Sequence, residues 1–549
     1  MPVISFKYED LDEFGISIEK ERLIDIIPML GSDIEDYNDE EIKIEFFPNR
    51  PDQLSLPGLS RSLKGFLSQE TGFPHYNLVE SGEKVIVDKD ILKIRPYIAF
   101  ALIKNVNFTG DKLKQIMDFQ ENLHWVIGRD RKKVAIGIHN LDVITGPYSY
   151  IGTEKEDNSF VPLEHKVKMT PLEILSEHEK GTKYAKLIKD FNKFPLILDS
   201  ENQVLSMPPI INGELTKLSE DTKNILVDVT GTDEIAVNQT LNIICSSFAE
   251  VGGKIESLEI VYPDKTITSP NLKASEKILH IDTTNELIGI NIDVKEAEKL
   301  LLKARMDAKI LNDNEILVTI PSYRVDILHE VDLVENIAIQ YCINKIESKL
   351  PEIATIANEH SWFKNDKIIR EIMVGLGFQE IMSLMLTSEE NHYQKMNKQE
   401  KEHVQVEKQI TIDRTMIKTS LINGIIEFLE DNKHEDLPQK IFEIGDILYL
   451  DEDKETKTKL VKKLAGAICH STANFTEMKS TIANILSNLG YKMTIYPSEN
   501  ESFIPGRVAD FIGETKNTKL KGVFGELSPE VIVNFGIEYP IIAFELEFL

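Results

Sequence analysis

Cysteine is scarce in this sequence of 549 residues, which contains three cysteines, Cys245, Cys342 and Cys469. They are odd in number and far apart, so they form neither a disulfide framework nor a pair with metal-ligand spacing. We expect buried free thiols in a reducing compartment. No segment reaches the ~18 apolar residues of a membrane span, and the N-terminus has no basic flank and apolar core typical of a secretion signal. These absences predict a cytoplasmic protein with no membrane segment.

Positive charge is also in short supply. The chain has 62 Lys and Arg against 91 Asp and Glu, a formal net charge of -29. Binding of nucleic acid by bulk charge needs clustered Lys and Arg, so any such role here needs a local basic surface or a basic partner. The 42% of hydrophobic residues is too high for a disordered chain. The length exceeds one hydrophobic core and predicts about three to five domains.

Common nucleotide-binding and hydrolase motifs are absent. The segment Val251-Gly252-Gly253-Lys254 lacks both the first glycine and the following Ser or Thr of a Walker A loop. Gly-x-Gly-x-x-Gly, His-Glu-x-x-His and Gly-x-Ser-x-Gly do not occur in the sequence. The sequence therefore does not indicate a self-contained ATPase, zinc protease or serine hydrolase.

Composition and periodicity indicate a multi-domain α+β chain. We expect domains at residues 1–88, 89–265, 270–350 and 351–549. In the first, residues 43–47 alternate polar and apolar like a strand, and leucines within 55–67 lie on one helix face. In the third, Thr283 with Glu286 and Asp293 with Glu296 fit the capping box that begins a helix.

An acidic group of residues could hold a metal ion. Asp332, Glu335 and Asn336 are spaced i, i+3 and i+4, so a helix places them on one face. Asp326 lies just before that helix and can reach back to it. Oxygen ligands of this kind suit a hard cation such as Mg²⁺. The alternative is a solvated acidic helix face near the positive end of the helix dipole, which spacing alone favours.

Basic residues cluster at one place in this acidic chain. Arg129, Arg131, Lys132 and Lys133 precede an apolar segment, residues 134–138, and could contact a phosphate backbone. A solvated hairpin end is the alternative, and it is favoured when the run is considered alone.

Small polar residues lie at the ends of apolar segments in the second domain. Leu198 precedes Asp199-Ser200, Ser206 precedes Met207-Pro208-Pro209, and Asp228 and Thr230 close another apolar run. Such groups are consistent with a pocket that recognises a polar ligand. Turn formation, which Ser, Asp, Thr and Gly all favour, is the simpler explanation without further context.

Several of these motifs together resemble the β subunit of phenylalanyl-tRNA synthetase. They are Pro48-Asn49-Arg50-Pro51-Asp52 with Gly58 and Arg61, the run 326–336, and Phe442-Glu443-Ile444-Gly445. Further matches are residues 131–137, 375–380 and 525–530. Their order is that of the family, and they span nearly the whole chain. The length and the Arg-Lys-Lys segment resemble the archaeal form, which lacks the bacterial tRNA-binding insert and anticodon-binding domain.

The resemblance implies a fold of four parts: an N-terminal α/β domain, an editing module, a small metal-binding module and an inactive class II synthetase-like domain with an antiparallel sheet. It implies an assembly of two α and two β chains, in which the α chain binds ATP and phenylalanine and charges tRNA(Phe). Residues 351–549 lack the Phe-Arg-x-Glu that clamps ATP in class II enzymes. They are expected to be a scaffold, with a helix near residues 363–376 as a candidate contact to α.

The editing module implied by the resemblance answers a physical problem. A pocket built for phenylalanine rejects tyrosine poorly, because tyrosine merely adds a hydroxyl group, whereas a second site can hydrogen-bond that group and hydrolyse the error. The family's editing positions match Ser206, Asp228 and Thr230, with Leu198 as a wall residue. The basic residues at 129 and 131–133 are then candidates to guide the 3′ end of the tRNA.

The family's metal-binding module places Mg²⁺ on the positions of Asp326, Asp332, Glu335 and Asn336. The fourth position is usually acidic, and the neutral amide of Asn336 removes one charge. The implied metal is structural rather than catalytic. Two other functions are open on sequence grounds: a scaffold for α with a decayed editing site, and a free-standing hydrolase of mischarged tRNA.

Overall fold

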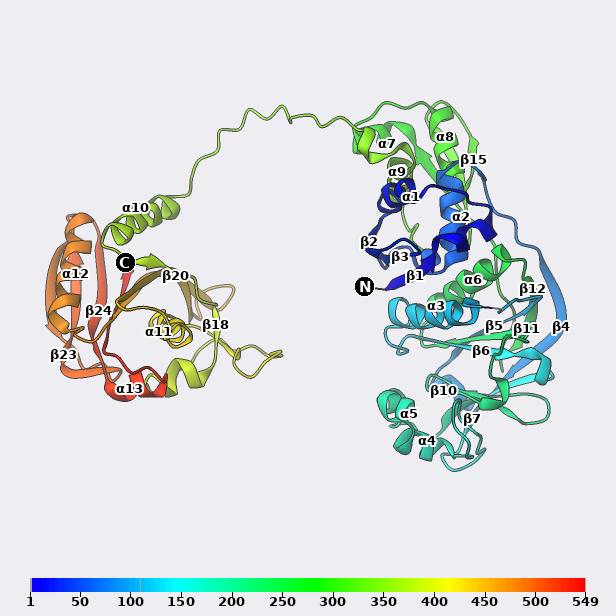
Figure 1. Ribbon diagram of the computed structural model, residues 1–549, viewed down its shortest axis with the longest axis horizontal. Helices are drawn as coiled ribbons and strands as arrows, with labels where there is room; N and C mark the ends of the chain where they lie inside the picture. Colours follow the sequence, from blue (N-terminus) through cyan, green and yellow to red (C-terminus); the bar gives the residue numbers. More distant parts are fainter. Residues whose placement is uncertain (1, 109, 549) are drawn as a thin grey trace. The chain divides into compact units, whose positions relative to one another are not determined.

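The computed structural model describes residues 2–108 and 110–548, and it divides into two compact units, Met1–Leu350 and Pro351–Leu549 (Figure 1). Each unit mixes helices with several sheets, so the chain is a multi-domain α+β protein, as the sequence predicts. No helix among these residues is long and apolar enough to cross a membrane.

The first part of unit 1 is a small sheet with order β1-β3-β2. Its strands are β1 (Val3–Lys7), β2 (Ser32–Tyr37) and β3 (Glu41–Phe46), and the helices beside it are α1 (Lys20–Ile26) and α2 (Leu56–Phe66). Residues 43–46 of the alternating segment lie in β3, which buries every second side chain, and Phe47 follows the strand. Ser55 caps α2 by accepting a hydrogen bond from the backbone N–H of Gly58. Both strand pairings are antiparallel, so this part is α+β and not the α/β domain that we expected.

The second part is a ten-stranded sheet with order β10-β9-β8-β7-β4-β12-β5-β11-β6, and β13 pairs with β12. Its strands are β4 (Leu78–Val87), β5 (Tyr97–Lys104), β6 (Val134–Asn140), β7 (Tyr148–Thr153), β8 (Phe194–Leu198), β9 (Val204–Met207), β10 (Ile211–Asn212), β11 (Asn224–Gly231), β12 (Lys254–Val261) and β13 (Thr266–Ser269). The sheet thus takes in β4, which lies before the boundary expected at residue 88.

Two helices cover one face of this sheet, α3 (Lys112–Val126) and α6 (Glu234–Glu250). Val227 and Val229 of β11 pack in the core that contains residues of both helices. Because side chains alternate along a strand, Asp228 and Thr230 point to the opposite face. Two short helices, α4 (Pro171–Glu177) and α5 (Glu179–Tyr184), lie between β7 and β8 in the chain.

The third part of unit 1 has a sheet with order β14-β16-β15. Its elements are β14 (Ser275–His280), α7 (Ile281–Ile288), α8 (Val294–Lys303), β15 (Asp307–Ile310), β16 (Glu315–Ile320) and α9 (Glu330–Tyr341). Asp293 caps α8 as predicted, accepting from the N–H groups of Lys295 and Glu296. The cap predicted at Thr283 was wrong, because α7 already begins at Ile281 directly after a strand.

Unit 2 is built on a seven-stranded sheet with order β17-β20-β21-β25-β24-β23-β22. Its strands are β17 (Gln379–Glu380), β20 (Gln439–Leu450), β21 (Thr458–Cys469), β22 (Lys492–Pro497), β23 (Phe503–Glu514), β24 (Lys519–Leu527) and β25 (Ile541–Phe548). Only the pairing of β17 with β20 is parallel among those described.

Helices cover both faces of this sheet, and a two-stranded sheet lies beside it. The helices are α10 (Ser361–Gly375), α11 (Ile422–Asp431), α12 (Phe475–Asn488) and α13 (Pro529–Asn534), and the small sheet pairs β18 (Leu386–Thr387) with β19 (Met416–Ile417). Residues of α11 and α13 share one core, and residues of α10 and α12 share the other. The helix expected near residues 363–376 is α10.

Candidate functional site

A cleft of about 220 Å³ opens beside the ten-stranded sheet of unit 1. Residues of α3, β6 and the segment 206–218 line it, together with Asp228 of β11. Three residues singled out from the sequence meet there: Ser206, Asp228 and Arg131. The structure therefore brings together side chains that are up to 97 residues apart in the chain, as counted from 131 to 228.

Asp228, which lines the cleft, belongs to a buried polar network of three side chains. His139 Nε2 lies 2.8 Å from Asp228 Oδ2, and His139 Nδ1 lies 2.7 Å from the hydroxyl of Thr216. All three side chains are almost completely removed from solvent. An ionised carboxylate only accepts hydrogen bonds, so the network places a ring proton on Nε2 and lets Thr216 donate to Nδ1. This arrangement holds the imidazole and the carboxylate in one orientation.

Glycine at position 137 makes room for this pair. Gly137 of β6 lies directly opposite Asp228 of β11 in the antiparallel register. A Cβ atom at position 137 would lie 2.0 Å from Asp228 Oδ2 and 2.7 Å from His139 Nε2. His139 was not among the predicted site residues. The sequence feature that could have pointed to His139 is its place as a polar residue at the end of an otherwise apolar segment.

Ser206 carries the strongest sign of a ligand. Its side chain is 2% exposed, it lines the cleft, and its hydroxyl has no hydrogen-bond partner among the described residues. A buried polar group left without a partner costs about 1–3 kcal/mol. A ligand that brings a polar group into the cleft would remove this penalty.

The basic run does not form one surface. Arg129, Asp130 and Arg131 all have left-handed backbone, with φ of 49°, 54° and 65°. Each such residue costs roughly 1–2 kcal/mol, which indicates that the surrounding structure enforces the turn. The turn sends Arg131 into the protein and leaves Arg129 and Lys132 exposed, while Lys133 forms an ion pair of 3.2 Å with Asp233.

Arg131 ties three elements together at the wall of the cleft. Its guanidinium donates to the carbonyl of Ile210 at 3.0 Å and to Glu121 of α3 at 2.5 Å. It also lies 4.7 Å from the centre of the Tyr184 ring, at the end of α5. Arg131 therefore shapes the cleft as a structural cation. Of the four residues predicted to contact tRNA, Arg129 and Lys132 are exposed and do not hold the cleft wall.

His124 supports the same wall. Its Nε2 accepts a hydrogen bond of 2.8 Å from the backbone N–H of Ile136 in β6, and its Nδ1 lies 3.3 Å from Glu121. Burial lowers the pKa of His124 below its ordinary value, so the ring is held in the neutral form that can accept this bond.

The other two predicted editing residues are not among those that line the cleft. Thr230 accepts a hydrogen bond of 2.9 Å from Arg95 Nε through its hydroxyl, and its carbonyl accepts one of 2.7 Å from Nη2. Burial lowers the pKa of the Arg95 guanidinium to about 10. Leu198 packs in a buried apolar cluster with Phe160 and Ile174. Neither residue lines the cleft.

The structure does not gather the four predicted Mg²⁺ ligands into a metal site. Both carboxylate oxygens of Asp326 accept hydrogen bonds from Arg324, and so does the amide oxygen of Asn336. Asp332 instead caps α9, and Glu335 is exposed. No group of three or more His, Cys, Asp or Glu within residues 2–108 and 110–548 has the arrangement to hold a metal ion. The donor set does not fit Mg²⁺, because a guanidinium already lies among the oxygens.

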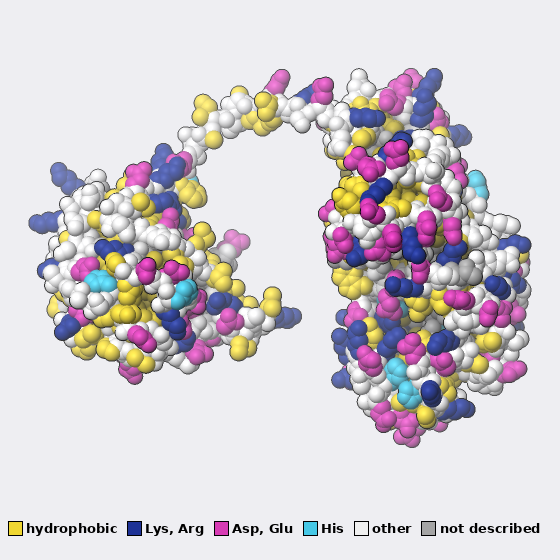
Figure 2. All heavy atoms as spheres, viewed as in Figure 1, with side chains coloured by type: hydrophobic (Ala, Val, Ile, Leu, Met, Phe, Trp, Pro, Cys, Tyr) yellow, Lys and Arg dark blue, Asp and Glu magenta, His cyan; other side chains and the backbone are white. Residues whose placement is uncertain are grey.

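Acidic and basic side chains share the surface of the protein. On the face in view, acidic and basic side chains are interspersed over both units, and basic side chains gather beside α3 and α5 of unit 1 (Figure 2). The cleft is lined by residues of these two helices. Positive charge is thus present near the cleft although the chain as a whole is acidic.

Models of three protein domains match successive parts of the chain. The B3/4 domain matches residues 101–247, the tRNA synthetase B5 domain matches 278–342, and the phenylalanyl tRNA synthetase beta chain CLM domain matches 346–548. The cleft lies in the first of these segments, the Arg324 cluster in the second and the seven-stranded sheet in the third.

Similar proteins cover the chain from end to end. The phenylalanine–tRNA ligase beta subunit of Methanosphaera stadtmanae is 50% identical and aligns over 100% of this chain and 99% of its own length. That of Methanocaldococcus jannaschii is 44% identical over 100% of both. An N-terminal fragment of the phenylalanyl-tRNA synthetase beta subunit from Pyrococcus horikoshii superposes with a TM-score of 0.60 and 36% identity, covering 62% of this chain and 99% of the fragment. The chain therefore belongs to the phenylalanine–tRNA ligase β subunit family and is a subunit of an aminoacyl-tRNA synthetase, an enzyme of protein biosynthesis.

Proposed function

We propose that the cleft in the B3/4 domain is an editing site that hydrolyses tyrosine from mischarged tRNA(Phe). One observation carries the proposal: the carboxylate of Asp228 and the unpartnered hydroxyl of Ser206 line the same cleft. A site that hydrogen-bonds the tyrosine hydroxyl favours the wrong amino acid strongly, because phenylalanine would leave the buried polar groups of the site unpaired.

Asp228 is the proposed acceptor for the tyrosine hydroxyl. His139 holds its Oδ2 atom at 2.8 Å, which fixes the carboxylate and offers the Oδ1 atom to the substrate. Ser206 supplies a second polar contact. Thr230 and Leu198 do not line the cleft and support the fold around it, Thr230 through its bonds with Arg95 and Leu198 through packing.

The tRNA contacts divide according to the turn at residues 129–131. Arg129 and Lys132 are exposed and flank Arg131 of the cleft wall in the chain, which suits them to phosphate contacts. Arg131 shapes the wall, and Lys133 holds Asp233 at the start of α6. Loss of Arg129 and Lys132 is expected to weaken tRNA binding by an amount that decreases with added salt.

The assembly is proposed to contain two α and two β chains, with this chain as β. The relatives are named beta subunits, which implies an alpha partner. In unit 2, α10 exposes Trp362, Phe363 and Val374, a group of large apolar side chains that suits a protein contact. Adenylation of phenylalanine and its transfer to tRNA are assigned to the α chain.

The requirement for Mg²⁺ is assigned to the α chain as well, because Mg²⁺ in such enzymes binds with the phosphates of ATP.

The test uses this chain co-expressed with its α partner. Attachment of phenylalanine to tRNA(Phe) and hydrolysis of Tyr-tRNA(Phe) are measured for the wild type and for Asp228→Ala. We expect Asp228→Ala to retain aminoacylation and to lose hydrolysis. Asp221→Ala is the matched control, since Asp221 is an exposed aspartate just before β11, and it should leave both activities unchanged. Hydrolysis at the wild-type rate by Asp228→Ala would remove Asp228 from the site.

The same measurements separate the two alternatives. A scaffold with a decayed editing site would give a wild-type complex that charges tRNA but hydrolyses no Tyr-tRNA(Phe). A free-standing hydrolase would act without α and would not copurify with it. The ordered pair of His139 and Asp228 argues against decay, because a disused site has no need of a buried carboxylate held by a second buried polar residue.

A further inference from the structure

The guanidinium of Arg324 lies where the predicted metal ligands would need a cation. Arg324 Nε and Nη2 donate to the two carboxylate oxygens of Asp326 at 2.9 and 2.6 Å, and Nη2 also donates to Asn336 Oδ1 at 2.8 Å. The Arg324 and Asp326 side chains are 2% and 9% exposed. A planar guanidinium matches a carboxylate with two parallel bonds, so this contact is among the stronger ones that a side chain can make.

The remaining predicted ligands are occupied or face solvent. Asp332 Oδ2 accepts from the backbone N–H groups of Leu328 and His329, both at 2.7 Å, and so closes the first turn of α9. The amide nitrogen of Asn336 donates to the carbonyl of Asp332 at 2.6 Å, which turns the amide oxygen toward Arg324. Glu335 is exposed on the helix.

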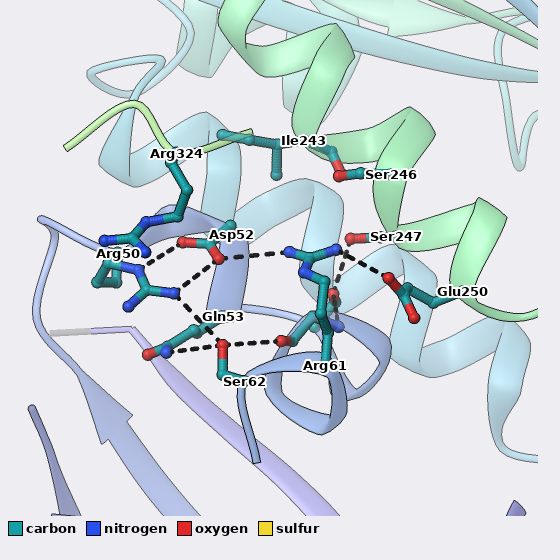
Figure 3. A network of polar contacts seen from close by, with 12 residues as sticks. Arg50, Asp52, Gln53, Arg61, Ser62, Ile243, Ser246, Ser247, Glu250 and Arg324 are labelled. Atoms are coloured by element: carbon teal, nitrogen blue, oxygen red, sulfur yellow. Dashed lines mark hydrogen bonds and ion pairs between the residues drawn. The ribbon is translucent and has the colours of Figure 1, made fainter. Parts of the chain in front are cut away.

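Arg324 lies beside a buried ion-pair network in the N-terminal part of unit 1 (Figure 3). Arg50 donates to both oxygens of Asp52 at 2.8 and 2.9 Å, and Arg61 reaches the same carboxylate at 3.3 Å. Arg61 also lies 3.6 Å from Glu250, the last residue of α6, which covers the ten-stranded sheet. The motif Pro48–Asp52 with Arg61, which is part of the family resemblance, therefore has a structural role here.

The network and the B5 domain meet through an aromatic ring. The Arg61 guanidinium lies 3.6 Å from the centre of the Tyr323 ring, and Tyr323 directly precedes Arg324. Such a contact is favourable and grows stronger when buried. Counting both clusters, three guanidinium groups (Arg50, Arg61 and Arg324) face three carboxylates (Asp52, Glu250 and Asp326), so the group is balanced in charge without any ion from outside.

We propose that Arg324 is the built-in cation of the B5 domain in this chain, and that the clusters around Arg324 and Asp52 join the three parts of unit 1 without a divalent metal. A Mg²⁺ ion bound to Asp326 and Asn336 would have to displace the Arg324 guanidinium or lie next to it. The second arrangement is unfavourable, because two positive charges in contact repel strongly. The family's usual acidic residue is replaced here by the neutral Asn336, so Arg324 contacts a single carboxylate, that of Asp326, and the two charges cancel.

The test measures divalent metal on the full chain in complex with its α partner, without ATP. Thermal unfolding is followed in EDTA and in excess Mg²⁺, and Mn²⁺ binding is counted by electron paramagnetic resonance. We expect the same number of bound Mn²⁺ ions in the wild type and in Asp326→Asn, and the same unfolding midpoint for this chain with and without Mg²⁺. A bound ion that disappears in Asp326→Asn, or a midpoint that rises with Mg²⁺ in the wild type only, would overturn the proposal.

Variants of the arginine sharpen the result. Arg324→Met removes the cation and should lower the unfolding midpoint, and Mg²⁺ should then raise the midpoint of this variant more than that of the wild type. Arg324→Lys keeps the charge and should retain more stability than Arg324→Met. Arg22→Met, at an exposed arginine of α1, is the matched control and should match the wild type. If Arg324→Met does not fold, the metal titration of the wild type and Asp326→Asn decides alone.

Discussion

His139 and Asp228 lie 89 residues apart in the chain and form one buried unit, with His139 Nε2 2.8 Å from Asp228 Oδ2. The pair lies on neighbouring antiparallel strands, β6 and β11, and Thr216 orients the far side of the ring. Position 137 must remain glycine for the pair to form. The proposed editing chemistry therefore depends on backbone as well as on side chains.

Gly137→Ala should disable editing without touching synthesis. The added Cβ would lie 2.0 Å from Asp228 Oδ2, so the carboxylate must move away from His139. Loss of a hydrogen bond to a charged group corresponds to about 1.5–3 kcal/mol, or roughly a 10- to 100-fold slower hydrolysis of Tyr-tRNA(Phe). The measurement is kcat/KM for that hydrolysis, with aminoacylation by the α partner as the internal reference.

Gly152→Ala is the control for this change. Gly152 lies in β7 of the same sheet, and the nearest atom to a new Cβ there is 3.4 Å away, so the substitution should be tolerated. His139→Ala should resemble Gly137→Ala in its effect on hydrolysis, and the double variant should be no slower than either single one. Additive losses would show that the two residues act separately.

Ser206→Ala should separate function from stability. Because the hydroxyl has no partner among the described residues, its removal breaks no bond of the protein, and the free energy of unfolding should change by less than about 0.5 kcal/mol. Hydrolysis of Tyr-tRNA(Phe) should fall roughly 5- to 10-fold, as expected for a lost hydrogen bond of ~1 kcal/mol. Urea unfolding and steady-state kinetics supply the two values, with the exposed Ser200→Ala as control. A strongly destabilised Ser206→Ala would indicate a structural hydroxyl instead.

Mild acid should destabilise the wall of the cleft through His124. Burial lowers its pKa below the value of 6.5 that it has when unfolded, so the unfolded chain binds the proton more readily. The contribution to stability is complete above pH 6.5 and is lost as the pH falls toward the folded pKa, with a slope of at most about 1.4 kcal/mol per pH unit.

The wild type should therefore unfold more easily at pH 5 than at pH 7, and His124→Gln should show a shallower dependence. Glutamine keeps an oxygen that can accept from the Ile136 N–H but does not titrate. His165→Gln, at an exposed histidine, is the reference. Equal slopes for wild type and His124→Gln would exclude His124 as the titrating group.

Stronger acid should act on Asp52. Burial opposes its ionisation, but the guanidinium groups of Arg50, Arg61 and Arg324 outweigh burial and lower the pKa from 3.8 to about 2. Because the folded pKa is the lower one, the stabilisation is present above about pH 4 and disappears as the pH falls toward 2, an effect of about 2 kcal/mol. Unfolding of Asp52→Asn should lack this pH dependence, whereas the exposed Asp25→Asn should keep it.

Local features of the fold followed from the sequence because they depend on neighbours a few residues apart. Residues 43–46 of the alternating segment lie in β3, the spaced leucines lie in α2 and at its C-cap, and Asp293 caps α8. The cap at Thr283 failed for a local reason as well, since the strand before it runs straight into the helix and Thr283 falls inside it.

The candidate site was predictable in part. Ser206 and Asp228 were found because they match a family pattern, and the cleft brings them together. His139 was missed because its partner lies on another strand. A role cannot be assigned to a histidine in an apolar strand until that partner is known. Arg131 was expected to contact tRNA, but three left-handed residues turn it into the wall of the cleft.

The sequence by itself determined the family, the α+β class and the residues that carry charge and polarity. Only the tertiary structure decided what those charges do. Asp326 and Asn336 are two of the four predicted metal ligands, yet in space they meet the guanidinium of Arg324. The physical reason is that a carboxylate binds whichever cation the fold brings within hydrogen-bond distance, and helical spacing specifies which oxygens share a face but not which cation they meet.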